Sequence, residues 1–177
     1  IHNEDLTKQL NDHDTTLPGF GPFGTSGKHC FDPGSPAYIR IAALCKVRQS
    51  HLILRAGRQY PREIRTQDYF HIPQAGGLVV WSRILDNQEA VIIVNPNGNA
   101  QSQIGGDIMV STELCNPGDR FIVLVNTAQI AVGASGGEYI GSHPAGSSLA
   151  VQGTHPLFIS VHDIDPGEVI VLLKEYV

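Results

Sequence analysis

Two apolar runs separated by a short polar stretch lie near the middle of the chain. Leu78–Leu85 and Ala90–Val94 flank the sequence Asp86-Asn87-Gln88-Glu89. Val, Ile and Trp favour strands and Asp-Asn favours a tight turn, so the pattern predicts a β-hairpin. The second run hardly alternates, and its side chains would point to both faces of a strand. We therefore expect both faces of this strand to be covered by other elements, because a hairpin alone cannot bury them.

Short apolar segments bounded by turn residues predict further strands on both sides of the hairpin. Turns are indicated by Asn95-Pro96-Asn97-Gly98-Asn99, Pro117-Gly118-Asp119 and Asp165-Pro166-Gly167. The Gly/Ser-rich segment Ile130–Gly146 is predicted to be a loop. This spacing is typical of a mainly β protein with an antiparallel Greek-key β-sandwich of about eight strands. Besides the hairpin, the predicted strands lie near residues 51–55, 62–66, 107–112, 120–126, 147–152, 156–162 and 168–175.

One helix is predicted ahead of the strands. Ser35-Pro36 has the residues of a helix N-cap and first turn. The spacing of Tyr38, Ile41, Ala42 and Cys45 then predicts a helix over residues 36–49 with a wide apolar stripe. Such a stripe, if uncovered, would favour self-association.

The segment before this helix has little periodicity. Thr15–Gly34 is rich in Gly, Pro, Ser and Thr and carries three Phe residues, which indicates a long, packed loop. The chain is therefore expected to consist of residues 1–50, a loop plus helix, and residues 51–177, the β-sandwich domain. Because the chain begins at Ile1 in the middle of a pattern, we expect it to be a piece of a longer protein.

Composition narrows the classes of protein to which this chain can belong. Charged residues make up only 16% of the 177 residues, and Gly and Pro are plentiful, as in folds with many strands and turns. The net charge of −5 and the absence of a Lys/Arg cluster argue against nucleic acid as a partner. No apolar run approaches the roughly 20 residues of a membrane span, and no signal peptide is visible, so a cytoplasmic protein without a membrane partner is expected. Cys30, Cys45 and Cys115 lack metal-type spacing and are predicted to be free, mostly buried thiols.

Asp12-His13-Asp14 is the one dense group of residues suited to acid, base or electrostatic work. Taken alone, such a tripeptide is more often a solvated acidic turn with a surface histidine than a site. The chain has no GxSxG, HExxH, P-loop or dinucleotide-binding motif, so no cofactor and no metal site are predicted. Each remaining histidine of interest is predicted to be a surface or strand residue; these are His51, His71, His143, His155 and His162.

The order of several segments resembles the C-terminal part of the α-amylase family of glycoside hydrolases, over essentially the whole chain. In that family a (β/α)8 barrel carries catalysis, and its last helix runs into a segment like LRxGxxxxR. An antiparallel C-terminal β-sandwich follows, with a (F/W)SR strand paired to a VVxN strand. The corresponding segments here are Leu10–Thr15, the helix Pro36–Leu44, Leu54–Arg62, Val80–Arg83 and Val91–Asn95.

The resemblance implies roles for two residues. Asp12-His13-Asp14 is similar to the family's Asn-His-Asp region, with Asp12 where Asn is usual. Asp14 would be the carboxylate that stabilises the transition state, and His13 would contact a substrate hydroxyl. The nucleophilic Asp and general-acid Glu of the family come from earlier barrel strands. A retaining glycosidase needs both, so the 177 residues alone are predicted to be inactive.

The expected function is therefore that of a non-catalytic C-terminal domain. It would stabilise the catalytic barrel of a retaining hydrolase or transglycosylase of carbohydrate metabolism that acts on an α-glucan or related sugar. One alternative is a carbohydrate-binding module, with Tyr139 as the exposed aromatic and Trp81 as a core residue. The other is a free-standing β-sandwich that mediates protein contacts.

Overall fold

The computed structural model describes residues 34–98 and 103–175, which form a mainly β structure. Residues 40–177 make one compact unit, and the described residues before it begin the first helix. No described helix is long and apolar enough to cross a membrane. The helices are α2 (Pro36–Ser50), α3 (Ile53–Ala56) and α4 (Thr127–Ala134). The strands are β1 (Arg58–Pro61), β2 (Ile64–Arg65), β3 (Val79–Leu85), β4 (Gln88–Val94), β5 (Ile104–Met109), β6 (Arg120–Asn126), β7 (Ser148–Ala150), β8 (Phe158–Ile164) and β9 (Val169–Lys174).

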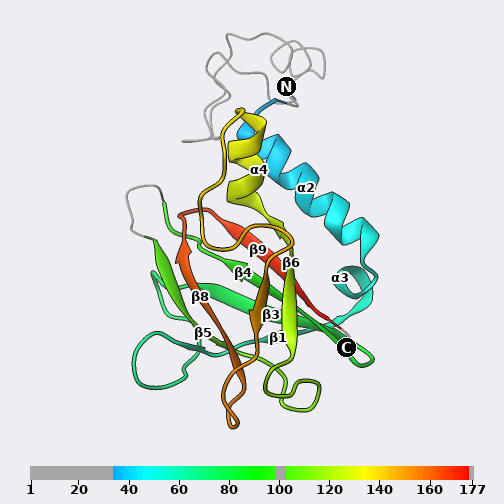
Figure 1. The fold of residues 1–177 in the computed structure, drawn as a ribbon, viewed down its shortest axis with the longest axis vertical. Coiled ribbons are helices and arrows are strands. Elements are labelled where there is room, and N and C mark those ends of the chain that lie inside the picture. Colours follow the sequence, from blue (N-terminus) through cyan, green and yellow to red (C-terminus); the bar gives the residue numbers. More distant parts are fainter. Residues whose placement is uncertain (1–33, 99–102, 176–177) are drawn as a thin grey trace, which may run out of the picture. The chain divides into compact units, whose positions relative to one another are not determined.

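The nine described strands form two antiparallel sheets (Figure 1). The large sheet has the order β1-β3-β4-β9-β6-β7, and the small sheet has the order β2-β5-β8. Within the described chain, only β3–β4 and β6–β7 follow one another in the same sheet, and every other connection changes sheet. This arrangement confirms the predicted mainly β, sandwich-like fold.

The predicted hairpin is formed by β3 and β4, which are paired from Val79↔Val94 to Leu85↔Gln88. The turn is shorter than predicted. Asp86 and Asn87 alone connect the strands, and Asp86 adopts a positive φ of 52°, which Asp tolerates better than most residues. Glu89, predicted to lie in the turn, is a residue of β4.

Both faces of β4 are buried, as its continuous apolar run predicts. Val91 and Ile93 belong to the core between the two sheets. Ala90 and Ile92 belong to a second apolar cluster on the opposite face of the large sheet, where α2 and α3 lie (Figure 1). β9 divides its residues between the two clusters in the same way, so β4 and β9 form the centre of the fold.

The predicted helix over residues 36–49 is confirmed as α2. Three of its residues, Ala43, Leu44 and Val47, pack against the second apolar cluster. Trp81, predicted to be a core residue, is half-buried against the same cluster. The predicted mostly buried thiols are corrected in one respect, because Cys45 of α2 is exposed while Cys115 is buried.

The predicted strand near residues 51–55 is wrong, because this segment forms the short helix α3. Ile53 and Leu54 are adjacent in sequence, yet both are buried in the second cluster, which a helical turn permits and a strand does not. Gly57 ends this helix. A Cβ there would lie 2.4 Å from the backbone oxygen of Ile53, so only glycine fits. Gly57 leads directly into β1, an edge strand that the sequence pattern did not predict.

The predicted loop over residues 130–146 is also partly wrong, because its first residues belong to α4. The side chain of Asn126 caps this helix by accepting hydrogen bonds from the backbone N–H groups of Ala128 and Gln129, at 2.8 and 3.2 Å. Asn is among the best N-cap residues. The helix ends at Ala134, and the Gly/Ser-rich remainder is the loop that leads to β7.

Candidate functional sites

The residues predicted to take part in catalysis lie outside the described part of the chain. Asp12, His13 and Asp14 all fall in residues 1–33, so the structure brings none of them together with other groups. Their roles stay predictions. The described residues contain two other concentrations of polar groups, one at the α4–β7 loop and one between β1, β3 and β4.

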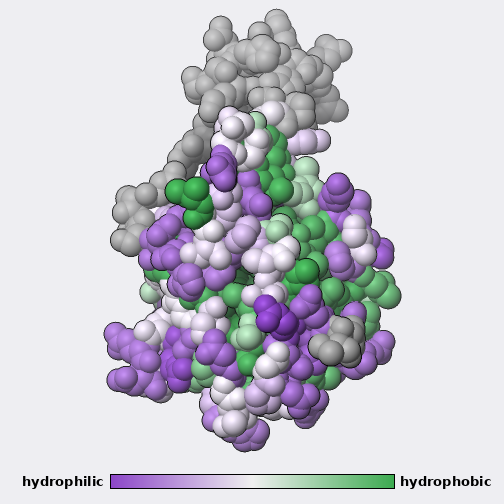
Figure 2. All heavy atoms as spheres, viewed as in Figure 1, coloured by the Kyte–Doolittle hydropathy of each residue, from purple (hydrophilic) through white to green (hydrophobic). Residues whose placement is uncertain are grey.

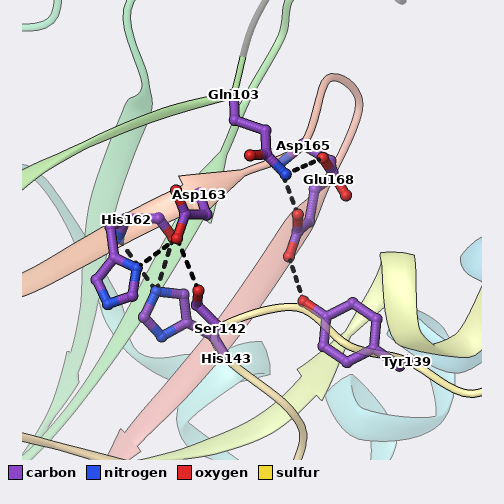
Figure 3. Close-up of polar contacts among 8 residues, drawn as sticks. All are labelled: Gln103, Tyr139, Ser142, His143, His162, Asp163, Asp165 and Glu168. Atoms are coloured by element: carbon purple, nitrogen blue, oxygen red, sulfur yellow. Dashed lines mark hydrogen bonds and ion pairs between the residues drawn. The ribbon is translucent and has the colours of Figure 1, made fainter.

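The first concentration is named here the loop cluster, and Figure 3 shows its members around the start of β9. The α4–β7 loop supplies Tyr139, Ser142 and His143, while the end of β8 and the turn into β9 supply His162, Asp163, Asp165 and Glu168. Asp163 adopts a positive φ of 56° within β8. Its carboxylate accepts a hydrogen bond from Ser142 Oγ at 2.9 Å and lies 2.8 Å from Nδ1 of His162.

The two histidines of the loop cluster differ in environment. His143 is buried, with 2% of its surface exposed, and its ring centroid lies 4.9 Å from that of His162. Its Nε2 lies 3.1 Å from the backbone nitrogen and 3.0 Å from the backbone oxygen of His162. Its Nδ1 has no hydrogen-bond partner in the described structure. Burial, and then the neighbouring His162, lower the pKa of His143 below its ordinary value, so the neutral ring is favoured.

Glu168 is the buried carboxylate of the loop cluster. Its Oε1 accepts hydrogen bonds from Asn126 Nδ2 at 2.6 Å and from the Tyr139 hydroxyl at 3.5 Å. Its Oε2 accepts one from the backbone N–H of Asp165 at 2.7 Å. Burial raises the pKa of Glu168 above its ordinary value despite these hydrogen bonds. Burial also raises the pKa of Tyr139, so both groups favour their neutral forms.

The loop cluster is suited to holding the α4–β7 loop in place rather than to nucleophilic catalysis. In a Ser-His-Asp triad the histidine stands between the serine and the carboxylate. Here Asp163 stands between Ser142 and His162, so the serine hydroxyl donates to a weakly basic carboxylate and not to an imidazole. Tyr139, proposed from the sequence as an exposed sugar platform, is half-buried with its hydroxyl turned toward Glu168 (Figure 3), and this expectation is corrected.

The second concentration centres on Glu89, whose side chain is fully buried. Its Oε1 lies 2.5 Å from Arg62 Nη2 and accepts a hydrogen bond of 2.5 Å from Ser82 Oγ. Its Oε2 accepts hydrogen bonds from the Ser111 backbone N–H at 2.9 Å and from the Cys115 thiol at 3.5 Å. Burial first, and the Glu89 charge second, raise the pKa of Cys115 to about 12. This arrangement joins the end of β1, strands β3 and β4, and the β5–β6 connection. It also keeps Cys115 a protonated, unreactive thiol at neutral pH.

Sequence reasoning missed both buried carboxylates. Glu89 was assigned to the hairpin turn and Glu168 to the first position of a predicted strand, and neither was singled out as a buried or functional residue. Their partners lie far away in sequence: Arg62 is 27 positions from Glu89, and Asn126 is 42 positions from Glu168. Only the strand order brings them together.

The described residues include no group of three or more His, Cys, Asp or Glu side chains that could hold a metal ion. The arrangements found are hydrogen-bond networks and ion pairs within the sandwich. Comparison of the chain with models of known protein families found no match, and a search of curated proteins found none.

Proposed function

We propose that this chain is the C-terminal, non-catalytic part of an α-amylase-like glycoside hydrolase or transglycosylase. In this proposal an earlier part of a longer chain forms a catalytic barrel, and the β-sandwich stabilises it. The barrel acts on an α-glucan or related sugar and retains the configuration of the anomeric carbon. Asp14 is then the carboxylate that stabilises the transition state, and His13 contacts a substrate hydroxyl.

The order of elements supports the proposal. A long helix, α2, runs through α3 into β1, and the LRAGRQY segment spans this connection. The WSR segment lies in β3 and the VIIVN segment ends β4, and the two strands pair as neighbours near the middle of the large sheet. These are the positions that the resemblance to the α-amylase family implies for a C-terminal sandwich domain.

The apolar surface of α2 is the observation that carries the proposal. Ala43, Leu44 and Val47 face the large sheet and pack on its second apolar cluster. The opposite side of the helix is also apolar: Ile41 is 61% exposed, and Ala42 and Cys45 are exposed beside it. Figure 2 shows apolar side chains at the surface over α2 and α4. A helix with apolar residues on two opposite sides is expected between two bodies, and among the described residues the sandwich covers one of these sides.

A matched pair of substitutions on α2 tests the proposal. Ile41→Asp places a charge on the exposed side, and Leu44→Asp places one on the side that packs on the sandwich. We expect Leu44→Asp to lower the midpoint of thermal unfolding of the isolated 177 residues and of the longer chain. Ile41→Asp is expected to leave the isolated chain unchanged and to destabilise only the longer chain, by about 2 kcal/mol, because only there is Ile41 buried.

Two results would contradict the proposal. One is an Ile41→Asp variant of the longer chain that unfolds at the same temperature as the parent. The other is robust hydrolysis of α-glucans by the isolated 177 residues that Asp14→Ala abolishes, because a retaining glycosidase needs a nucleophile and a general acid that the proposal places upstream. An upstream sequence without barrel-forming strands would instead favour a free-standing interaction domain.

A further inference from the structure

A hollow of about 440 Å3 lies between the β2–β3 loop and the start of β5. Its floor includes Ile64 and Leu78, each only 1% exposed. Its polar lining comes from the loop itself, with Thr66, Gln67, Asp68 and Gln74 all exposed. The volume falls within the range of about 300–1,000 Å3 that is usual for small-molecule sites.

The β2–β3 loop is held at both ends, so the hollow is preformed. Ile64 and His71 exchange two backbone hydrogen bonds, of 2.8 and 3.0 Å. At the other end, Asn97 Nδ2 donates a hydrogen bond of 2.9 Å to the backbone oxygen of Gly76. A preformed site loses less conformational entropy when a ligand binds.

Two neighbouring aromatic residues of this loop behave in opposite ways. Phe70 packs under the guanidinium of Arg65, which lies 5.0 Å from the Phe70 ring centroid and 4.8 Å from that of Phe158. Arg65 is itself fixed by Asp107, 2.7 Å away. Tyr69 is instead 68% exposed at the hollow, and its ring meets that of His71 in an edge-to-face arrangement with 5.7 Å between centroids. The anchored Phe70 therefore holds Tyr69 out at the mouth of the hollow.

The chemistry of the lining points to one class of ligand. No Lys or Arg is among the described residues that line the hollow, which disfavours an anion, and a single carboxylate disfavours a bare cation. An exposed aromatic ring beside one carboxylate, two amides and a hydroxyl suits a ligand with an apolar face and many hydroxyl groups. We propose that this hollow binds a neutral saccharide, with a sugar ring stacked on Tyr69 and its hydroxyls bonded to Asp68 and the two Gln side chains.

The choice of an α-glucan as first probe rests on the proposed function, while the site itself does not. Calorimetric titration of the 177-residue chain with maltoheptaose is expected to show binding. Tyr69→Ala should weaken it by about tenfold or more, through loss of the stacking surface, and Tyr69→Phe should retain it within about threefold. Tyr60→Ala is the matched control, because Tyr60 is also exposed, at 37%, but lies on the edge strand β1 away from the lining of the hollow.

Several outcomes decide the proposal. The proposal is overturned if the chain binds none of the three oligosaccharides maltoheptaose, cellohexaose and xylohexaose. It is also overturned if Tyr69→Ala binds as tightly as the parent chain and unfolds at the same temperature. Binding of cellohexaose or xylohexaose in place of maltoheptaose would support a saccharide site and remove the α-glucan assignment. None of these results bears on the Ile41→Asp experiment, so the two proposals fail separately.

Discussion

The inner core of the sandwich has a buried glutamate at each end, and the two are stabilised in different ways. Glu89 and Ile93 lie on the same face of β4, and Glu168 precedes Ile170 and Leu172 on the corresponding face of β9. Because β4 and β9 are antiparallel neighbours, the two carboxylates lie at opposite ends of this core. Their exposed fractions are 0% and 2%.

The difference lies in the charge of the partners. Glu89 has Arg62 at 2.5 Å, a counter-charge that offsets the cost of removing the carboxylate from water. Among the described residues, the hydrogen-bond donors to Glu168 are all neutral and come from Asn126, Tyr139 and the backbone of Asp165. Hydrogen bonds without a counter-charge do not compensate for its burial, so the pKa of Glu168 is raised. The Glu89 end of the core therefore contains an ion pair. The Glu168 end contains a carboxyl group whose burial disfavours the charged form.

The largest effect is expected from removing the counter-charge of Glu89. In Arg62→Met the apolar stem is kept, but the buried carboxylate loses its cation. Breaking a buried pair in this way typically costs 3–5 kcal/mol, and because Arg62 remains 15% exposed we expect about 3 kcal/mol in the free energy of unfolding measured with urea.

Two further variants keep this prediction open to contradiction. Arg62→Met combined with Glu89→Gln should recover most of the loss, because no uncompensated charge then remains. Arg120→Met is the control, since Arg120 is 53% exposed and lies 4.0 Å from Glu175, a surface pair expected to contribute less than about 1 kcal/mol. Equal losses in Arg62→Met and Arg120→Met would mean that the Glu89 pair has no special role.

A smaller effect, visible as a pH dependence, is expected from Glu168→Gln. The folded state keeps the proton of Glu168 more tightly than the unfolded state does. Its contribution to stability is therefore fully present below its ordinary pKa of 4.5 and is lost as the pH rises through the raised pKa of the folded state. Urea unfolding measured from below pH 4.5 upward should show the free energy of unfolding falling as the pH rises, and Glu168→Gln should remove this fall. Glu113→Gln, on an exposed residue, should leave the fall intact, and a parallel curve for Glu168→Gln would refute this account.

The parts of the fold that could be predicted from sequence are those decided by local patterns. The hairpin was predicted because the runs around Asp86-Asn87 are apolar and the turn residues are favourable, and β3 and β4 pair there. Ser35-Pro36 and the spacing that follows predicted α2 for the same reason. α3 was missed because Ile53-Leu54 is too short a run to distinguish a strand from a helical turn. α4 was missed because its N-cap, Asn126, ends a strand and precedes a Gly/Ser-rich segment.

The sites could not be predicted in the same way, because their partners are distant in sequence. A two-residue difference in where the hairpin turn ends moves Glu89 from the predicted turn into β4, whose pairing register then buries it. Tyr139 was expected to be exposed because it lies in the Gly/Ser-rich segment, but its hydroxyl hydrogen-bonds to Asn126 and Glu168 and the residue is half-buried. Tyr69, which is exposed, has no such distant partner for its hydroxyl among the described residues.

The smallest effect, on cysteine reactivity, separates the two ends of the core without unfolding the protein. Cys115 is 3% exposed, donates to Glu89 and has a pKa raised to about 12, whereas Cys45 on α2 is exposed. Because the thiolate is the reactive form, iodoacetamide should label Cys45 in the native chain and reach Cys115 only when the structure opens. Peptide mapping by mass spectrometry should then find faster labelling of Cys115 in Arg62→Met and an unchanged rate in Glu168→Gln. If Cys115 in the native chain were labelled as fast as Cys45, the Glu89 end of the core would be open to solvent. The ion pair with Arg62 would then not keep that end closed.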